Sequence, residues 1–149
     1  MLLSTEGAGR GAAAQGARLE RLALRFMTGL RLSGSELSLT LVRDTEMRRL
    51  NAQWRAKDKP TDVLSFPAGE GPAVGLRPLG DVVISLDTGR RVARQLGATL
   101  EEELARYLAH GLLHLLGHDH HRKDEARRMR AEEERLLGFA GMLGRAADS

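Results

Sequence analysis

The amino-acid sequence predicts an α+β fold: a single domain in which a small mixed β-sheet of three or four strands packs with about five helices. Its 149 residues, 42% hydrophobic and 29% charged, suit one globular domain with a sizeable core. Long stretches with helical spacing stand beside short runs of β-type alternation. All five histidines fall between residues 110 and 121, on or just after a stretch that is apolar around most of a helix. We therefore expect a metal site on a central buried helix.

The first elements follow from local patterns. Residues 4–18 are rich in Gly and Ala and lack an apolar period, so residues 1–17 are expected to be a flexible segment. Within it, residues 2–3 can begin a short edge strand. Apolar residues at helical spacing predict a helix from Arg18, and alternating leucines predict a half-buried strand at residues 37–42.

The middle of the chain is expected to form a helix, two strands and a loop. Asp44 is expected to cap a helix that runs to about Arg55. Residues 61–67 form a β-type run that ends at a proline, and residues 80–86 predict a more buried strand. Residues 67–79 hold three of the four prolines, which indicates a loop.

Three helices complete the predicted domain. The first can start at Asp87 and close at Gly97. The second opens with the capping-box pattern Thr99-Leu100-Glu101-Glu102 and carries His110 and His114. The third, at residues 122–137, mixes both signs of charge and is interpreted as a solvated helix face. The domain is thus expected to span residues 18–140, with a C-terminal tail at 141–149.

Composition limits where the protein works. There is no cysteine, which excludes disulfides and thiolate ligands and suits the cytoplasm. We find no apolar run that suits a signal peptide or approaches the roughly 20 residues of a membrane span, so no membrane partner is expected. Arginine supplies all but three of the 23 basic residues. Genomic bias and phosphate binding both explain that excess, and composition does not separate them.

The histidines have the spacing of a metal site. His110 and His114 are one helical turn apart, so their imidazoles project from the same face. Gly117 can end the helix in the left-handed conformation, after which the chain can bring His120 towards the first two rings. The offsets 0, 4 and 10 match the zinc-protease pattern H-E-x-x-H-x-x-G-x-x-H. Zinc is the expected metal, although nickel, iron or copper would accept these ligands.

The neighbouring residues have more than one interpretation. His118 or His121 could close the site as a fourth ligand and make it structural, but the open three-ligand pattern favours water there. Asp119 is placed to orient a ligand ring, or simply to cap the helix end. Gly111 stands where the proteases carry their general-base glutamate. A metalloprotease is therefore disfavoured unless another acid, such as Glu70, reaches the metal.

Two long motifs resemble a known family. The first, His110-Gly111-Leu112-Leu113-His114-Leu115-Leu116-Gly117-His118-Asp119-His120, is similar to the H-G-x-L-H-L-x-G-x-D-H signature of the bacterial YbeY family. Members are metal-dependent endoribonucleases that act as ribosomal RNA maturation factors. The second comprises Asn51-x-x-Trp54-Arg55 and Asp58-Lys59-Pro60-Thr61-Asp62-Val63-Leu64-Ser65-Phe66-Pro67. The resemblance continues through Leu79-Gly80-Asp81-Val82 to the region of Met129 and Glu133, and covers about residues 36–139.

The resemblance also implies roles for single residues. It implies that His110, His114 and His120 ligate one zinc ion per chain and that Arg55 acts at the substrate phosphate. Arg55 also ends a predicted helix and precedes a basic turn with Lys57 and Lys59, which independently favours substrate binding. A surface arginine in an arginine-rich protein is the alternative. Thr61 and Ser65 are expected to line the cleft, although strand-edge hydrogen bonding explains them about as well.

The resulting hypothesis is a zinc-dependent, single-strand-specific endoribonuclease. It would act in ribosomal RNA processing, at the 3′ end of 16S rRNA, and in ribosome quality control, with Arg55 and His114 as catalytic residues. Its partners would be single-stranded ribosomal RNA and small-subunit ribosomal proteins or assembly factors. The alternative is a zinc-stabilised ribosome-assembly factor that binds with little catalysis of its own.

Overall fold

The four strands in the described part of the chain form one mixed sheet, and β3, at one edge, borders the histidine-bearing helix. A computed structural model describes residues 1–68, 77–118 and 120–141. The elements in chain order are β1 (Leu2–Ser4), α1 (Ala12–Gly29), β2 (Ser35–Val42), α2 (Asp44–Arg55), β3 (Val63–Pro67), β4 (Arg77–Ser85), α3 (Leu86–Leu96), α4 (Leu100–Leu115) and α5 (Lys123–Phe139).

The strand order is β1-β2-β4-β3. The first three of these strands are parallel, and β3 pairs with β4 in the antiparallel direction. The predicted α+β fold, with a small mixed sheet and five helices among the described residues, is therefore confirmed. In that same part of the chain, no helix combines the length and the apolar character needed to cross a membrane.

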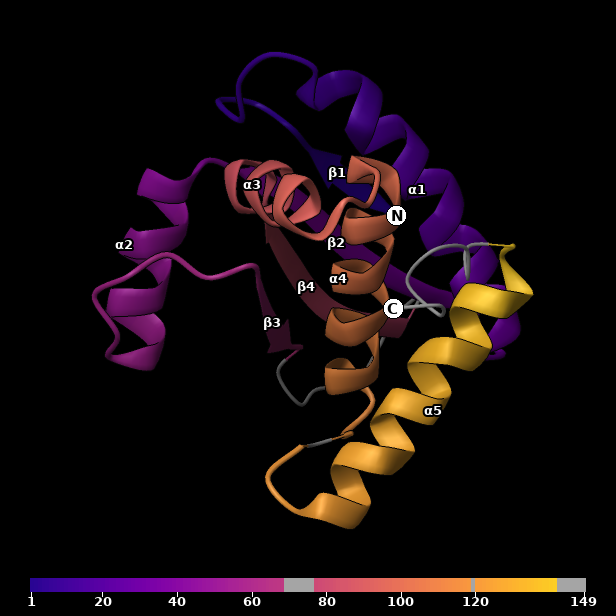
Figure 1. Cartoon of the computed structure of the whole chain (residues 1–149). Helices are drawn as coiled ribbons and strands as arrows, with labels where there is room; N and C mark the ends of the chain where they lie inside the picture. The colour runs from indigo at the N-terminus through magenta and orange to yellow at the C-terminus, as the bar shows by residue number, and fades with distance from the viewer. Residues whose placement is uncertain (69–76, 119, 142–149) are drawn as a thin grey trace.

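The two faces of the sheet meet different helices. Alternate residues of β2 and β4 (Leu37, Leu39, Leu41, Val82 and Ile84) pack with α1, α4 and α5 in the main core. The opposite face, with Leu64 and Val83, packs against Met47 of α2 in a smaller cluster. Figure 1 shows α4 passing in front of the sheet, with α5 on one side and α2 on the other. Separate helices therefore cover the two sides of β3.

The histidine-bearing helix has the predicted caps and burial. Thr99 accepts a hydrogen bond from the Glu102 amide (3.1 Å), and the Glu102 carboxylate accepts one from the Thr99 amide (3.3 Å). Leu104, Leu108, Leu112 and Leu113 are fully buried. At the other end Gly117 has φ +93°, and the amides of Gly117 and His118 donate to the carbonyls of His114 and Leu113. This Schellman ending turns the chain back beyond the helix, as Gly117 predicted.

The first helix begins earlier than the sequence indicated. It starts at Ala12 rather than Arg18, and β1 precedes it. Gly16 lies inside this helix, where an added Cβ would overlap the Thr5 methyl and lie 3.4 Å from Leu3. The Gly and Ala residues therefore allow close packing on the segment that contains β1. Part of segment 1–17 is thus strand and helix, and its flexibility stays a prediction; residues 142–149 of the expected tail lie outside the described residues.

Other boundaries also differ from expectation. β4 begins at Arg77, inside the predicted loop, of which residues 69–76 lie outside the described part. α3 begins one residue before Asp87, and the Ser85 side chain caps it by accepting from the Thr88 amide. α5 is more than a solvated face, because Met129, Leu136 and Leu137 are buried. Pairing with β2 extends β4, and tertiary packing gives α5 its buried face, whereas the start of α3 is set by a local cap.

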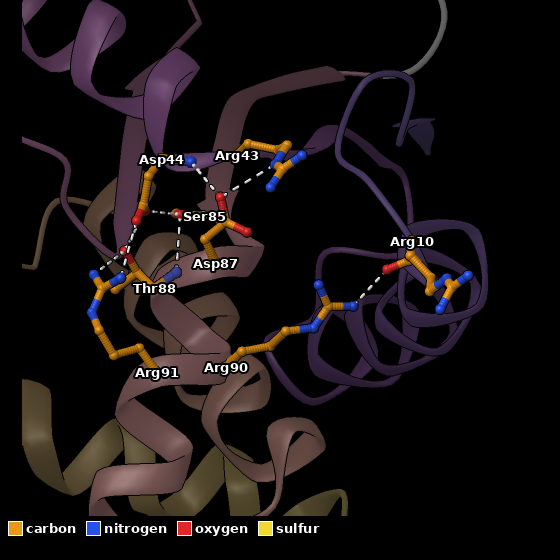
Figure 2. Close-up of polar contacts among 8 residues, drawn as sticks. All are labelled: Arg10, Arg43, Asp44, Ser85, Asp87, Thr88, Arg90 and Arg91. Carbon is orange, nitrogen blue, oxygen red and sulfur yellow. Dashed lines mark hydrogen bonds and ion pairs between the residues drawn. The ribbon is translucent and has the colours of Figure 1, made fainter.

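Asp44 is the first residue of α2 and not its cap, which is Arg43. Figure 2 shows its carboxylate accepting hydrogen bonds from Ser85 (2.6 Å), Thr88 (2.6 Å) and Arg91 (3.1 Å). Asp87 in turn accepts from the Asp44 amide (3.0 Å). This network ties the start of α2 to the junction of β4 and α3. It therefore helps to orient the helix that ends at Arg55.

The Asp44→Asn variant tests this network. Burial raises the pKa of the Asp44 carboxyl, but hydrogen bonds from Ser85, Thr88 and Arg91 outweigh it and hold the pKa below its ordinary value. A lowered folded-state pKa stabilises the fold above the unfolded-state pKa of about 3.9, and this contribution is lost as the pH falls through the folded-state value. We expect the variant to lose about 1–3 kcal/mol of unfolding free energy at pH 7.

The measurement is urea unfolding of both proteins at a series of pH values. Because protonation removes the same charge from wild type, the difference between the two proteins should shrink as the pH falls below about 4. A difference that stayed constant across this range would show that the Asp44 charge does not stabilise the fold.

Candidate metal centre and the adjoining cleft

The structure brings the three predicted ligands together. α4 places His110 and His114 on one face, and the turn at Gly117 returns His120 to them. The Nε2 atoms of His110 and His114 are 3.1 Å apart, and one ligand atom from each of the three histidines lies within 4.8 Å of the others. Two zinc–nitrogen bonds of tetrahedral geometry would place their nitrogens about 3.3 Å apart. The arrangement therefore fits a divalent metal ion.

Glu133 of α5 supports the first ligand. Its carboxylate oxygen lies 2.5 Å from Nδ1 of His110, and its side chain is only 16% exposed. A carboxylate only accepts hydrogen bonds, so we assign a proton to Nδ1 of His110. Its Nε2 is then unprotonated and can bind a metal ion. Carboxylates commonly hold metal-binding histidines in this way.

The sequence predicts this orienting role for Asp119, which lies outside the described residues. Glu133 could have been found by its position, because it lies on the face of α5 that carries Met129 and Leu136, four residues before and three residues after it. A carboxylate on the apolar face of a helix needs a partner. Because α5 carries many other charged residues, Glu133 resembles an ordinary surface residue in the sequence.

Close packing against the sheet explains why residue 111 is glycine. A Cβ added there would lie 2.8 Å from Val82 and 3.2 Å from Val63, so α4 packs directly on β3 and β4 at this residue. The glutamate that zinc proteases carry after their first histidine would not fit here without displacing the sheet. The other candidate for such a base, Glu70, lies outside the described residues.

The histidines open into a cleft of about 570 Å³. Its walls include the three predicted ligands, Arg55 from the end of α2 and two predicted cleft residues in and just before β3, namely His110, His114, His120, Arg55, Thr61 and Ser65. His121 also lines the cleft, although it does not join the three-histidine group, and His118 lies outside both. A neighbouring hollow of about 310 Å³ is lined by Lys57 and Lys59 and shares Arg55 and Thr61 with the cleft.

Arg55 is held at the rim by several contacts. Its guanidinium donates to the Ser65 carbonyl (2.9 Å) and to the Trp54 carbonyl (3.1 Å), and its Cζ lies 4.8 Å from the centre of the Phe66 ring. Buried Asn51 fixes the turn that follows, because its amide donates to the Lys59 carbonyl (2.9 Å). Two of the five guanidinium N–H donors are thus used within the described residues, and the others remain for a ligand.

The Glu133→Gln variant tests the supporting contact. A neutral amide holds the imidazole less strongly than a carboxylate, so we expect zinc affinity to fall about 10- to 100-fold. Competition with a chromogenic chelator measures this change. Glu134→Gln, the same substitution at the exposed neighbouring residue, is the matched control. Equal affinity in both variants would remove Glu133 from the site.

The fold and the site define an α+β protein with a candidate three-histidine metal centre beside an arginine-lined cleft. The family model described as "Endoribonuclease YbeY" matches residues 12–141. The chain therefore belongs to the endoribonuclease YbeY family, as its motifs suggested.

Individual relatives agree with this assignment. The chain is 65% identical over 120 residues to the "Endoribonuclease YbeY" of Myxococcus xanthus, a match that covers 79% of this chain and 41% of the relative. It is 51% identical over 129 residues to that of Anaeromyxobacter dehalogenans, covering 87% of this chain and 66% of the relative. The match to the Aquifex aeolicus relative is 49% over 120 residues and covers 80% and 79%. The chain thus spans less than half of the Myxococcus protein.

The fold is also similar to a solved structure. The solution structure of a Thermotoga maritima protein superposes with a TM-score of 0.60 at 27% identity, covering 93% of this chain and 90% of that one.

Proposed function

We propose that this protein is a zinc-dependent endoribonuclease that cleaves single-stranded RNA. The observation that carries the proposal is the convergence of His110, His114 and His120 in a cleft that Arg55 also lines. Zinc bound there would supply Lewis-acid charge to the phosphoryl group. The relatives named endoribonucleases support the same reaction.

The protein's own side chains would divide the remaining work. The contact from Glu133 keeps the His110 ring turned toward the other two ligands. Arg55, held at the Ser65 carbonyl, would direct its remaining N–H groups to the phosphate oxygens and stabilise the charge that develops there. Lys57 and Lys59, in the adjoining hollow, would attract the next phosphates of the chain.

Ribosomal RNA is the proposed physiological substrate. We place the activity in the cytoplasm, at the 3′ end of 16S rRNA and in ribosome quality control, with small-subunit proteins or assembly factors as partners. The support is the resemblance of the two long motifs to the family and the match to its model.

Metal removal and reloading tests the reaction. Zinc-reloaded protein is expected to cleave single-stranded RNA and to spare a duplex, whereas stripped protein should cleave neither. Cleavage should weaken steeply with salt because phosphate contacts dominate the binding of nucleic acids. A cyclic phosphate at the product end would identify the RNA 2′-hydroxyl as the nucleophile. Fully reloaded protein that leaves single-stranded RNA intact would contradict the proposal.

A second candidate function is a zinc-stabilised ribosome-assembly factor. The observation that favours it is that His120 comes from the segment beyond α4, so the same three ligands would also fasten that segment to the helix. After reloading with zinc, such a protein would bind structured ribosomal RNA but would not cut it. Binding without cleavage therefore separates the two functions.

The Arg55→Lys variant tests the proposed phosphate contact. Lysine keeps the charge but loses the planar fork that spans the Ser65 carbonyl, the Phe66 ring and the cleft. We expect the cleavage rate to fall about 100-fold, as when one charge-stabilising donor is removed, with zinc content unchanged. Arg49→Lys, on the same helix but paired with Glu46, is the control. Equal rates in the two variants would exclude Arg55 from the reaction.

A further inference from the structure

A third hollow, which we call the aromatic pocket, lies across β3 from the metal centre. It has a volume of about 530 Å³ and is lined by Leu50, Trp54, Arg55, Phe66, Pro67, Asp81 and Val83. Phe66 and Asp81 are direct partners across β3 and β4, so their side chains share one sheet face. That face is the one that α2 covers, whereas the histidines stand over the opposite face.

The floor of the aromatic pocket is aromatic, and much of it is open to solvent. Trp54 is 57% exposed and meets Phe66 edge to face, with ring centres 6.1 Å apart. The guanidinium of Arg55 lies over the Phe66 ring. A large exposed indole beside an arginine–aromatic stack is the kind of surface on which single-stranded nucleic acids stack their bases.

The aromatic pocket and the cleft that contains the three histidines meet at the edge of the sheet. Arg55 and Pro67 line both. Arg55 reaches from the end of α2 to the Ser65 carbonyl of the edge strand β3. Its guanidinium therefore stands between the aromatic pocket and the cleft. A phosphate held by Arg55 would leave the attached nucleoside within reach of the aromatic pocket.

Asp81 determines what the pocket can accept. Its carboxylate is exposed and has no hydrogen-bond or ion-pair partner among the described residues. A negative charge repels phosphate, and a carboxylate can only accept hydrogen bonds. Guanine is the base that presents two adjacent donors, N1–H and the N2 amine, and a carboxylate accepts such a pair with both oxygens. Uracil instead offers one N–H between two carbonyl oxygens.

We propose that the aromatic pocket holds a guanine base of the RNA beside the phosphate at Arg55. The base would stack on Trp54 and donate two hydrogen bonds to Asp81. The proposal rests on the proposed endoribonuclease function for the identity of the ligand, and it adds a base preference to that function. The rival occupant is a protein segment with apolar side chains.

Trp54 supplies its own reporter, because it is the sole tryptophan of the chain. The experiment titrates zinc-loaded protein with 2′-O-methyl tetranucleotides that differ in one base, which cannot be cleaved through the neighbouring hydroxyl. Tryptophan fluorescence reports stacking, and the anisotropy of a fluorescein label reports affinity. We expect saturable quenching and at least about tenfold tighter binding of the guanine oligonucleotide than of the uracil one.

Two variants separate stacking from base recognition. Trp54→Leu should weaken the binding of all the oligonucleotides about tenfold or more, because the stacking surface is lost. Asp81→Asn should remove the preference for guanine and leave the affinity for the uracil oligonucleotide unchanged. Leu96→Ala replaces a side chain that is 66% exposed outside the pocket and should change neither measurement. Circular dichroism confirms that each variant is folded.

The outcomes also separate this inference from the proposed function. Protein that cleaves RNA but shows neither quenching nor base preference would overturn the aromatic pocket and leave the function standing. Quenching with guanine preference in a protein that does not cleave would support the pocket and overturn the function. Quenching by an apolar peptide but by none of the oligonucleotides would assign the pocket to a protein partner and overturn the inference.

Discussion

The His114→Ala variant is expected to lose zinc and, with it, cleavage of single-stranded RNA. His114 lies between the other two ligands in the chain, and its Nε2 faces that of His110 at 3.1 Å. Its removal leaves two ligands, one of them from the segment beyond the helix. Because loss of a supporting residue alone costs 10- to 100-fold in metal affinity or activity, loss of a ligand should lower the cleavage rate by more than about 100-fold.

The measurements are zinc content by mass spectrometry and the cleavage rate in the presence of a fixed zinc concentration. His118→Ala is the matched control, because His118 belongs to the same cluster in sequence but not to the three-histidine group. It should retain zinc and cleavage. Equal cleavage by wild type and His114→Ala would point to a contaminating nuclease and remove the case for catalysis at this site.

Gly80→Ala is expected to produce the largest loss of stability. Gly80 has φ +137°, which side chains other than that of glycine rarely adopt. An added Cβ would overlap the Phe66 carbonyl and lie 2.9 Å from the Ala68 amide. These are backbone atoms of β3 and the residue that follows it, so no side-chain rotation relieves the overlap. We expect the unfolding free energy to fall by about 3 kcal/mol or more.

Urea unfolding, with the slope compared between proteins, measures this loss. Gly34→Ala is the matched control, because nothing lies within 4 Å of an added Cβ there and its φ is not in the left-handed region. Its stability should stay within about 0.5 kcal/mol of wild type. Equal losses in the two variants would show that β3 can move away from β4 at Gly80. The strand that carries Ser65 and borders the cleft would then be adaptable.

Some departures from expectation have a common cause. The helix is predicted to begin at Arg18 because the Gly and Ala run before it lacks an apolar period, yet α1 begins at Ala12, and its Gly16 lies where the helix approaches Thr5 and Leu3. Asp44 was predicted to cap a helix from its residue type, yet its carboxylate serves Ser85 and Thr88, some forty residues later. In both cases the deciding contact is tertiary. Local patterns contain no information about which distant segment will lie alongside.

Local sequence patterns predict the α+β class, the capping box at Thr99, the helix end at Gly117 and the three histidines that converge. The fold class follows from helical and β-type periods, and the cap, the helix end and the convergence of the histidines depend on residues at most about ten positions apart, which a helix and the turn after it bring together. Only the tertiary structure placed Glu133 against His110 and brought Arg55 to the edge of β3 between the cleft and the aromatic pocket. Those positions result from the packing of separate helices on the two faces of one sheet, and no local spacing specifies them.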